Sequence, residues 1–169
     1  MVYDKKNADL FLQNFNEAYR SAKLLMLSYE RLTNLMPIKG SLLNSLNMDD
    51  LDKLDAFRVR YCDLQDSLGS KIFRSILVLE EEAPGSNLDA LNKIEKRGII
   101  KTFEEWKLLR QIRNLFSHDY PDSDEDKAEF LSIAYSNTQN LVEVVDNVIQ
   151  YMQEKLDFNM KSFPFLLKK

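Results

Sequence analysis

The sequence predicts an all-α protein, an antiparallel helical bundle with three long helices and about two short ones. Three observations lead to this class. Apolar residues recur at alternating spacings of three and four along three long segments. No segment alternates apolar and polar side chains as a half-buried strand does. Only four Gly and four Pro occur among 169 residues, too few for the many tight turns of a β-sandwich or barrel.

The first long helix is expected over residues 7–36. Its apolar and small side chains recur at alternating spacings of four and three residues, which places them in one stripe along a helix. Pro37 and Gly40 are expected to end it. The stripe consists of Phe11, Phe15, Ala18, Ala22, Leu25, Tyr29, Leu32 and Met36.

The second long helix is expected to begin at Asn47, a good N-cap residue followed by several acidic side chains. It stops before the Pro84–Gly85 pair. Its predicted core stripe consists of Leu54, Phe57, Tyr61, Leu64, Leu68, Ile72, Ile76 and Leu79.

Capping signals predict the remaining helices. Ser86 with Asp89 resembles a capping box and opens a short helix that ends near Arg97, before Gly98. Thr102 with Glu105 opens a helix over residues 103–118, and Ser123 with Asp126 opens the last long helix. The apolar stripe of that last helix consists of Phe130, Ala134, Leu141, Val145, Val148 and Met152.

The helical pattern predicts a single domain over residues 1–156 and a C-terminal tail over residues 157–169. The tail mixes aromatic and apolar side chains with lysines. Two roles are open for it, an ordered cover that packs back on the bundle or a segment that docks a partner.

Composition excludes several classes of protein. A net charge of −4 excludes a generally basic nucleic-acid-coating protein, although not a local basic patch. Cys62 is the only cysteine, so no intramolecular disulfide or cysteine metal cluster is possible. The N-terminus lacks the apolar stretch of a signal peptide, and no apolar run approaches the length of a membrane span. We therefore expect a soluble cytoplasmic protein, with no metal site and no membrane association.

One face of the helix predicted over residues 103–118 concentrates chemically active groups. Successive residues of an α-helix are rotated by about 100°. This rotation brings five groups to one face: two guanidiniums, an amide, a hydroxyl and the only imidazole of the chain. These groups belong to Arg110, Arg113, Asn114, Ser117 and His118. The opposite arc is apolar and is expected to face the core. It contains Leu108, Leu109, Ile112, Leu115 and Phe116.

This set of groups suits phosphate chemistry. Two arginines can hold a phosphate in forked geometry, and a histidine can move a proton near neutral pH. RNA cleavage needs little else, because the 2′-hydroxyl of the substrate can act as the nucleophile. A single His118 supplies only one acid or base, so a two-fold dimer that pairs two copies would complete the site. An ordinary solvated helix face remains the alternative.

Charge placement gives weak support for a polyanion site. Residues 93–113 contain seven basic and three acidic side chains, a balance of +4. Residues 119–129 contain one lysine and six acids, a balance of −5. A basic helix is therefore followed directly by an acidic connection.

The segment also resembles a known family. Arg113, His118 and Tyr120 match the R-x4-H-x-Y motif of HEPN-domain toxins of the HepT type. The sequence between Lys96 and Arg110 looks similar to the region that precedes this motif in that family.

The resemblance implies an all-α homodimer that cleaves RNA without a metal or cofactor, with Arg113 and His118 as catalytic residues and Asn114 in support. It also implies a partner, a minimal nucleotidyltransferase antitoxin that transfers AMP from ATP to the motif tyrosine, here Tyr120. Arg110 is added as a phosphate-binding residue from its position on the helix face. In the alternative interpretation the chain is a nucleotide- or substrate-binding partner of a nucleotidyltransferase and has no nuclease activity.

Overall fold

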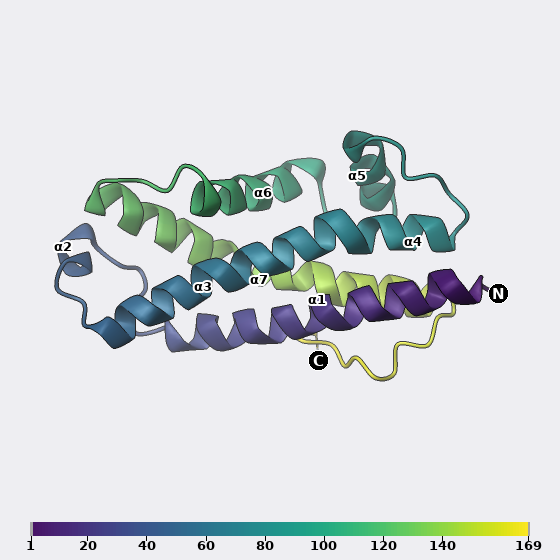
Figure 1. Cartoon of the computed structure of the whole chain (residues 1–169), viewed down its shortest axis with the longest axis horizontal. Helices are drawn as coiled ribbons and strands as arrows, with labels where there is room; N and C mark the ends of the chain where they lie inside the picture. The colour runs from purple at the N-terminus through teal and green to yellow at the C-terminus, as the bar shows by residue number, and fades with distance from the viewer. Residues whose placement is uncertain (1, 169) are drawn as a thin grey trace.

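The computed structural model describes residues 2–168, and the predicted all-α class is confirmed (Figure 1). Within these residues every regular element is helical. The elements are α1 (Lys5–Arg31), α2 (Gly40–Leu43), α3 (Met48–Ser67), η1 (Leu68–Ile72), α4 (Phe73–Leu79), α5 (Asn87–Lys96), α6 (Phe103–Ser117) and α7 (Asp124–Glu154).

The helix α1 and the continuous α3–η1–α4 helix form an antiparallel pair, as Figure 1 shows. All residues of the second predicted stripe, from Leu54 to Leu79, are buried. The helix α1 ends at Arg31, earlier than predicted, and Leu32 packs in the core just beyond it. Gly40 does not end this helix but begins the short α2, which the sequence analysis missed.

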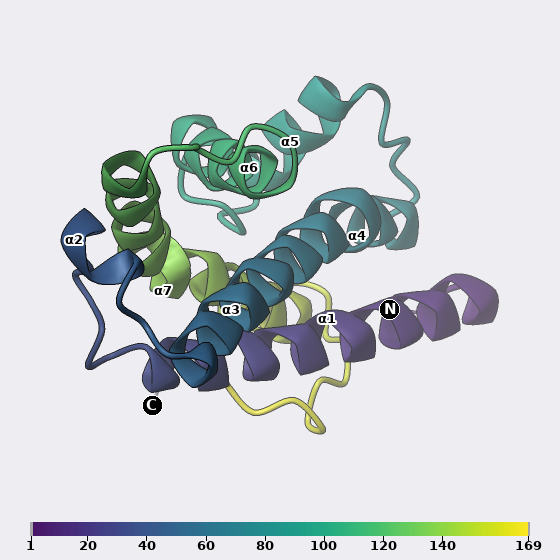
Figure 2. The same cartoon turned by 60° about the vertical axis from the view of Figure 1, so that its left-hand side comes forward.

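The helix α2 lies against the start of α7 (Figure 2). Gly40 makes this approach possible, because a Cβ atom at this position would lie 2.9 Å from the Cα atom of Glu125. Real Cβ atoms do not approach backbone atoms so closely, so any larger side chain would push the two helices apart.

A π-helical turn, η1, interrupts the second long helix. Its core residues Leu64, Leu68, Ile72 and Ile76 are separated by three consecutive steps of four. In a regular α-helix each such step turns the stripe by about 40° past a full turn. The wider π-turn removes this drift and keeps all four residues facing the core.

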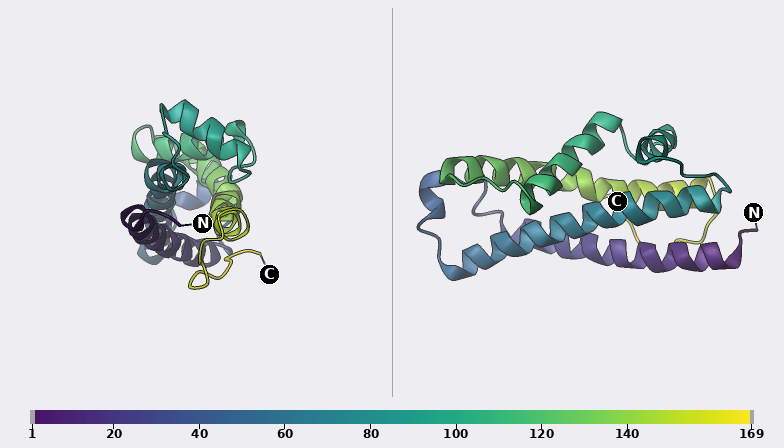
Figure 3. Two further views of the ribbon diagram at one scale, coloured as in Figure 1. Left: turned by 90° about the vertical axis from the view of Figure 1, so that its right-hand side faces the viewer. Right: turned by 45° about the horizontal axis from the view of Figure 1, so that its top comes forward.

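The helices α5 and α6 form an upper layer over the long helices (Figure 3). Ser86 and Asp89 form the predicted reciprocal capping box of α5, and Gly98 follows that helix with a φ of 70°. The Thr102 hydroxyl accepts a hydrogen bond from the Glu105 backbone N–H at the start of α6. The helix α7 begins after the Ser123 cap, as predicted.

The C-terminal tail packs back on the bundle as an ordered cover. The Phe158 and Phe163 rings join the aromatic residues of α1, with the Phe163 centroid 4.9 Å from that of Phe15. The Tyr19 hydroxyl donates to the Pro164 carbonyl oxygen at 2.8 Å. Of the two roles left open for the tail, the structure shows the cover.

Among the described residues, no helix combines the length and the apolar character needed to cross a lipid bilayer.

Candidate functional site

The helix α6 carries the candidate site and presents its polar side chains away from the core. Trp106, Leu109, Ile112 and Phe116 are buried on its inner side. The predicted apolar arc is partly wrong, because Leu108 is 40% exposed and Leu115 is 36% exposed. The inner face is rotated toward Trp106, so these two leucines border the polar face instead of the core.

Arg113 is held by an acidic residue of the neighbouring helix α3. Its Nε donates to Oδ1 of Asp66 at 2.7 Å, and its Nη2 donates to Oδ2 at 2.9 Å. This bidentate geometry fixes the plane of the guanidinium and raises the pKa of Arg113 above its usual value, mainly through the hydrogen bonds to Asp66. The two N–H bonds of Nη1 remain available to another acceptor, since no group within residues 2–168 accepts from them.

His118 and Asn114 lie together at the C-terminal end of α6. His118 is the C-cap residue, and its backbone N–H donates to the Asn114 carbonyl oxygen at 2.9 Å. Both side chains are exposed. The imidazole can therefore meet a ligand from solvent without any rearrangement of the bundle.

A shallow hollow beside this helix end contains residues that sequence reasoning did not assign to the site. Cys62 lies there, with its Sγ 3.6 Å from the Ser117 Oγ and 3.8 Å from the Arg113 carbonyl oxygen. Burial raises the pKa of the Cys62 thiol, and the Ser117 hydrogen bond opposes this only in part. Arg58 and Asp55 form the far side of the hollow.

The Tyr120 side chain does not project away from the bundle beside His118, as an acceptor of AMP on the surface would. Its ring is half-buried and packs near Phe116 and Phe130, each with a centroid 6.2 Å away. The Arg58 guanidinium lies 3.9 Å from the centroid of the ring. Burial raises the pKa of Tyr120 above its usual value. The short connection before α7 folds the ring back onto the end of α6.

Arg110 lies about one turn before Arg113 and Asn114 on α6 and lines a pocket formed with η1 and α5. Asp66 also lines this pocket, so the same residue separates Arg110 from Arg113. Arg113, Asn114, Ser117 and His118 therefore occupy the last turn and the C-terminal end of α6, and Arg110 adjoins a separate pocket toward the start of the helix.

Ion pairs within the bundle reduce the predicted basic patch. Four of the seven basic side chains between residues 93 and 113 pair with carboxylates. The paired residues are Lys93, Arg97, Lys101 and Arg113. Arg110 is one of the three basic side chains of this segment that form no ion pair in the part of the chain that the structure describes.

A pattern in the sequence could have revealed the α3 side of the site. Arg58, Cys62 and Asp66 are spaced by four residues, which places them in one row along a helix. This row borders the apolar stripe and lies against α6 in the structure. The spacing alone does not indicate which helix this row faces.

Comparison with known proteins does not identify a family for this chain: no protein-family model, no curated protein and no solved structure matches it.

Proposed function

We propose that this chain is a ribonuclease of the HEPN type that cleaves RNA with Arg113 and His118 and acts as a homodimer. The observation that carries the proposal is the guanidinium of Arg113, oriented by Asp66 in the last turns of α6, close in sequence to the exposed His118 at the end of that helix. An arginine held on one side by a carboxylate presents its remaining N–H bonds in a fixed direction, which suits recognition of a phosphate.

The proposed reaction needs one proton acceptor and one proton donor. The 2′-hydroxyl of the RNA attacks the adjacent phosphorus, the bond to the 5′-oxygen breaks, and a 2′,3′-cyclic phosphate forms. In the dimer, one His118 accepts the proton of the 2′-hydroxyl, and the other donates a proton to the leaving 5′-oxygen. Arg113 stabilises the charge that develops on the phosphorane oxygens, and Asn114 orients the phosphate.

The dimer is supported by apolar side chains around the site. Val59 is 60% exposed on α3 beside Cys62, and Leu108 and Leu115 are exposed on α6. Leu115 lies three residues before His118, so a two-fold contact through the end of α6 would bring two His118 side chains together. A solution mass measured by light scattering at micromolar concentration tests this, and a monomer would remove the two-histidine reaction.

The proposed control of the activity is transfer of AMP to Tyr120 by a nucleotidyltransferase antitoxin. The phenol oxygen attacks the α-phosphorus of ATP, pyrophosphate leaves, and the phenol proton passes to a base of the partner. The Tyr120 hydroxyl makes no hydrogen bond within residues 2–168, so modification breaks no polar contact. Intact-mass spectrometry after coexpression tests this, and a mass gain that Tyr120→Phe does not remove places the modification elsewhere.

The central test is cleavage of total tRNA by the purified chain in the presence of EDTA. The wild type is expected to cleave, and His118→Ala and Arg113→Lys are each expected to lose the activity while keeping their helical circular dichroism. Lys107→Gln, an exposed charge change on the same helix, serves as the matched control. Undiminished cleavage by His118→Ala would falsify the proposed role of that residue, and loss of wild-type cleavage in EDTA would require a metal.

One observation favours the second candidate, a non-nuclease binding partner of a nucleotidyltransferase. The ion pair with Asp66 could give Arg113 a purely structural role. In that case the isolated chain would bind its partner and leave RNA intact, whereas the nuclease proposal requires cleavage by the isolated chain.

A further inference from the structure

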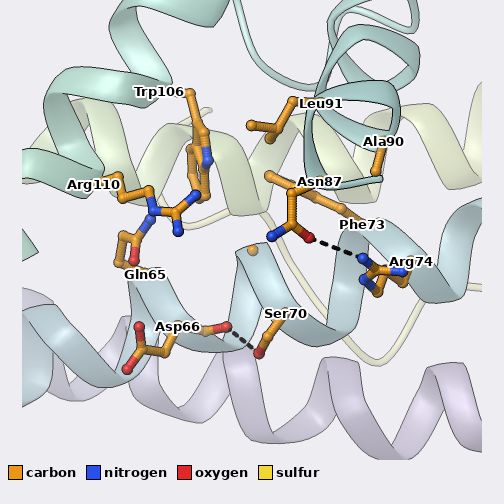
Figure 4. Close-up of a pocket in the computed structure, with 11 residues that line it drawn as sticks. Gln65, Asp66, Ser70, Phe73, Arg74, Asn87, Ala90, Leu91, Trp106 and Arg110 are labelled. Atoms are coloured by element: carbon orange, nitrogen blue, oxygen red, sulfur yellow. Dashed lines mark hydrogen bonds between the residues drawn. The ribbon is translucent and has the colours of Figure 1, made fainter. Parts of the chain in front are cut away.

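A pocket with a volume of about 150 Å³ lies between the π-turn η1, α5 and α6 (Figure 4). Gln65 and Arg110 stand on one side of it, and Arg74 and Asn87 stand on the other. The aromatic rings of Trp106 and Phe73 lie at its inner end, with centroids 4.8 Å apart. The pocket thus combines polar walls with an aromatic interior. The remaining lining residues are Asp66, Gly69, Ser70, Ala90 and Leu91.

Two mostly buried residues in this pocket carry polar groups that form no hydrogen bond with the described protein residues. Gln65 is 4% exposed and Trp106 is 2% exposed. Within residues 2–168, neither the Gln65 amide nor the Trp106 indole N–H makes a hydrogen bond. These polar atoms are not sealed from solvent, because the buried side-chain nitrogen or oxygen that lacks a partner within residues 2–168 is Nε of Arg58. They are therefore open to hydrogen bonds with a ligand that enters the pocket. Both groups adjoin the open space of the pocket.

The charge at the pocket is positive. Arg110 forms no ion pair in the described chain, and Arg74 is held by the Asn87 side chain, whose Oδ1 accepts from its Nη2 at 2.9 Å. The only acidic lining residue is Asp66, and its carboxylate is occupied by Arg113. Figure 4 shows this carboxylate pointing away from the pocket. Two guanidiniums therefore face an opening with no free carboxylate, which favours an anionic ligand.

The size of the pocket suits one six-membered ring. An engineered apolar protein cavity of about 150 Å³ holds a benzene molecule. The Trp106 and Phe73 rings supply an aromatic surface for stacking. The Gln65 amide offers both a donor and an acceptor to the edge of a ring, and the Asn87 amide offers its N–H donors. Gly69 keeps this space open, because a Cβ atom there would lie 3.3 Å from Cζ2 of Trp106.

We propose that this pocket binds a pyrimidine nucleotide, with the base at Trp106 and Gln65 and the phosphate at Arg110 and Arg74. The ligand is either a free nucleotide or an unpaired pyrimidine of an RNA strand, because both present the same ring and phosphate. This binding site goes beyond the cleavage proposed for Arg113 and His118 and does not require it. If both proposals hold, the pocket selects a base close to the cleaved phosphate, since Asp66 joins the pocket to Arg113.

The direct test is titration of the full chain with uridine 5′-monophosphate, followed by fluorescence. Trp106 is the only tryptophan of the chain, so its emission reports on the pocket alone. We expect saturable quenching by the nucleotide, and at least tenfold weaker binding of uridine alone, inorganic phosphate alone and the larger guanosine 5′-monophosphate. No saturable change with the uridine nucleotide, by fluorescence or by calorimetry, overturns the proposal.

Matched variants identify the contacts. Arg110→Gln is expected to weaken binding at least tenfold, whereas Lys107→Gln, which removes one exposed charge from the same helix, is expected to change it less than twofold. Gly69→Ala is expected to weaken binding by crowding Trp106, with helicity unchanged. Equal effects of the Arg110 and Lys107 variants would show that only net charge matters and would refute the pocket.

Two further arms separate the possible ligands and the two proposals. A uridine pentanucleotide that binds at least tenfold more tightly than the mononucleotide identifies an RNA strand as the ligand, and equal affinities identify the free nucleotide. His118→Ala is expected to keep full nucleotide binding even where RNA cleavage is lost. In the wild type, absence of cleavage with intact nucleotide binding overturns the nuclease proposal alone, and cleavage without nucleotide binding overturns the pocket proposal alone.

Discussion

The Arg113 guanidinium of α6 and the Asp66 carboxylate of α3 face each other in a bidentate ion pair, with distances of 2.7 and 2.9 Å. The pair crosses between the two helices and joins two surfaces. On one side lies the edge that carries His118, and on the other lies the pocket that contains Arg110. Asp66 therefore influences both the orientation of Arg113 and the charge of the pocket.

Replacing Asp66 by Asn is expected to lower RNA cleavage by about 10- to 100-fold, because a small error in the position of a catalytic group has an effect of this size. The unfolding free energy is expected to change by less than about 1 kcal/mol, since the pair is partly exposed. Initial cleavage rates and urea unfolding measure the two effects. Asp63→Asn, the same change at an exposed position of α3, is the control, and equal rates for the two variants would contradict a positioning role.

Features that depend on residues close together in the sequence could be predicted, whereas features that depend on distant residues could not. The caps at Asn47, Ser86 and Thr102 depend on groups within three residues, and all were predicted from the sequence. The contact between Asp66 and Arg113 joins residues 47 positions apart. It depends on how α3 and α6 are rotated against each other, which a helical pattern alone does not specify.

The same limit explains the errors at Leu108 and Leu115 and the inward position of Tyr120. Leu109, Ile112 and Phe116 of the predicted apolar arc are buried. The burial of Trp106 rotates the inner face of α6 away from the other two leucines. Pro121 follows Tyr120 directly, and a residue before proline favours an extended backbone. Contacts with Phe130 of α7, and with Arg58 of α3, which is far away in the sequence, hold the ring inward.

Replacing Arg58 by Met is expected to destabilise the fold by roughly 1–3 kcal/mol. The side chain stacks on Tyr120 at 3.9 Å, and its Nη2 donates to the Phe116 carbonyl oxygen at 2.9 Å, at the end of α6. A cation–π contact and a charged hydrogen bond are lost together. Urea unfolding measures the change. Arg20→Met on the exposed side of α1 is the control, with an expected effect below about 0.5 kcal/mol, and an equally small effect at Arg58 would contradict the argument.

Replacing Asp146 by Ala is expected to release the C-terminal tail and to destabilise the fold by roughly 3 kcal/mol. The Asp146 side chain is 0% exposed, and its carboxylate accepts hydrogen bonds from the backbone N–H groups of Leu166, Leu167 and Lys168 at 2.6 to 2.9 Å. Removing this acceptor leaves several donors unsatisfied, each at a cost of about 1–3 kcal/mol.

Limited trypsin digestion provides a second measurement for the tail, because Lys161 lies within it. Cleavage after Lys161 is expected to be faster in Asp146→Ala than in the wild type, and Asp146→Asn, which keeps one acceptor oxygen, is expected to give an intermediate rate. Equal digestion rates in all three proteins would show that the aromatic contacts of Phe158 and Phe163 alone hold the tail.

The Cys62 thiol is expected to react slowly with iodoacetamide at neutral pH and progressively faster as the pH rises beyond 9. Burial raises its pKa above the usual value, and the hydrogen bond with Ser117 and the charge of Arg113 reverse only part of this effect. Since the thiolate is the reactive form, a raised pKa lowers the reactive fraction at pH 7. Mass spectrometry of the alkylated chain between pH 7 and 10 gives the rates.

Ser117→Ala removes a contact that favours the thiolate, so this variant should need a still higher pH for the same rate. Cys62→Ser removes the only cysteine and should remain unlabelled. A rate that already levels off near pH 7 would mean that Arg113 dominates the electrostatics of the hollow, contrary to the balance described here.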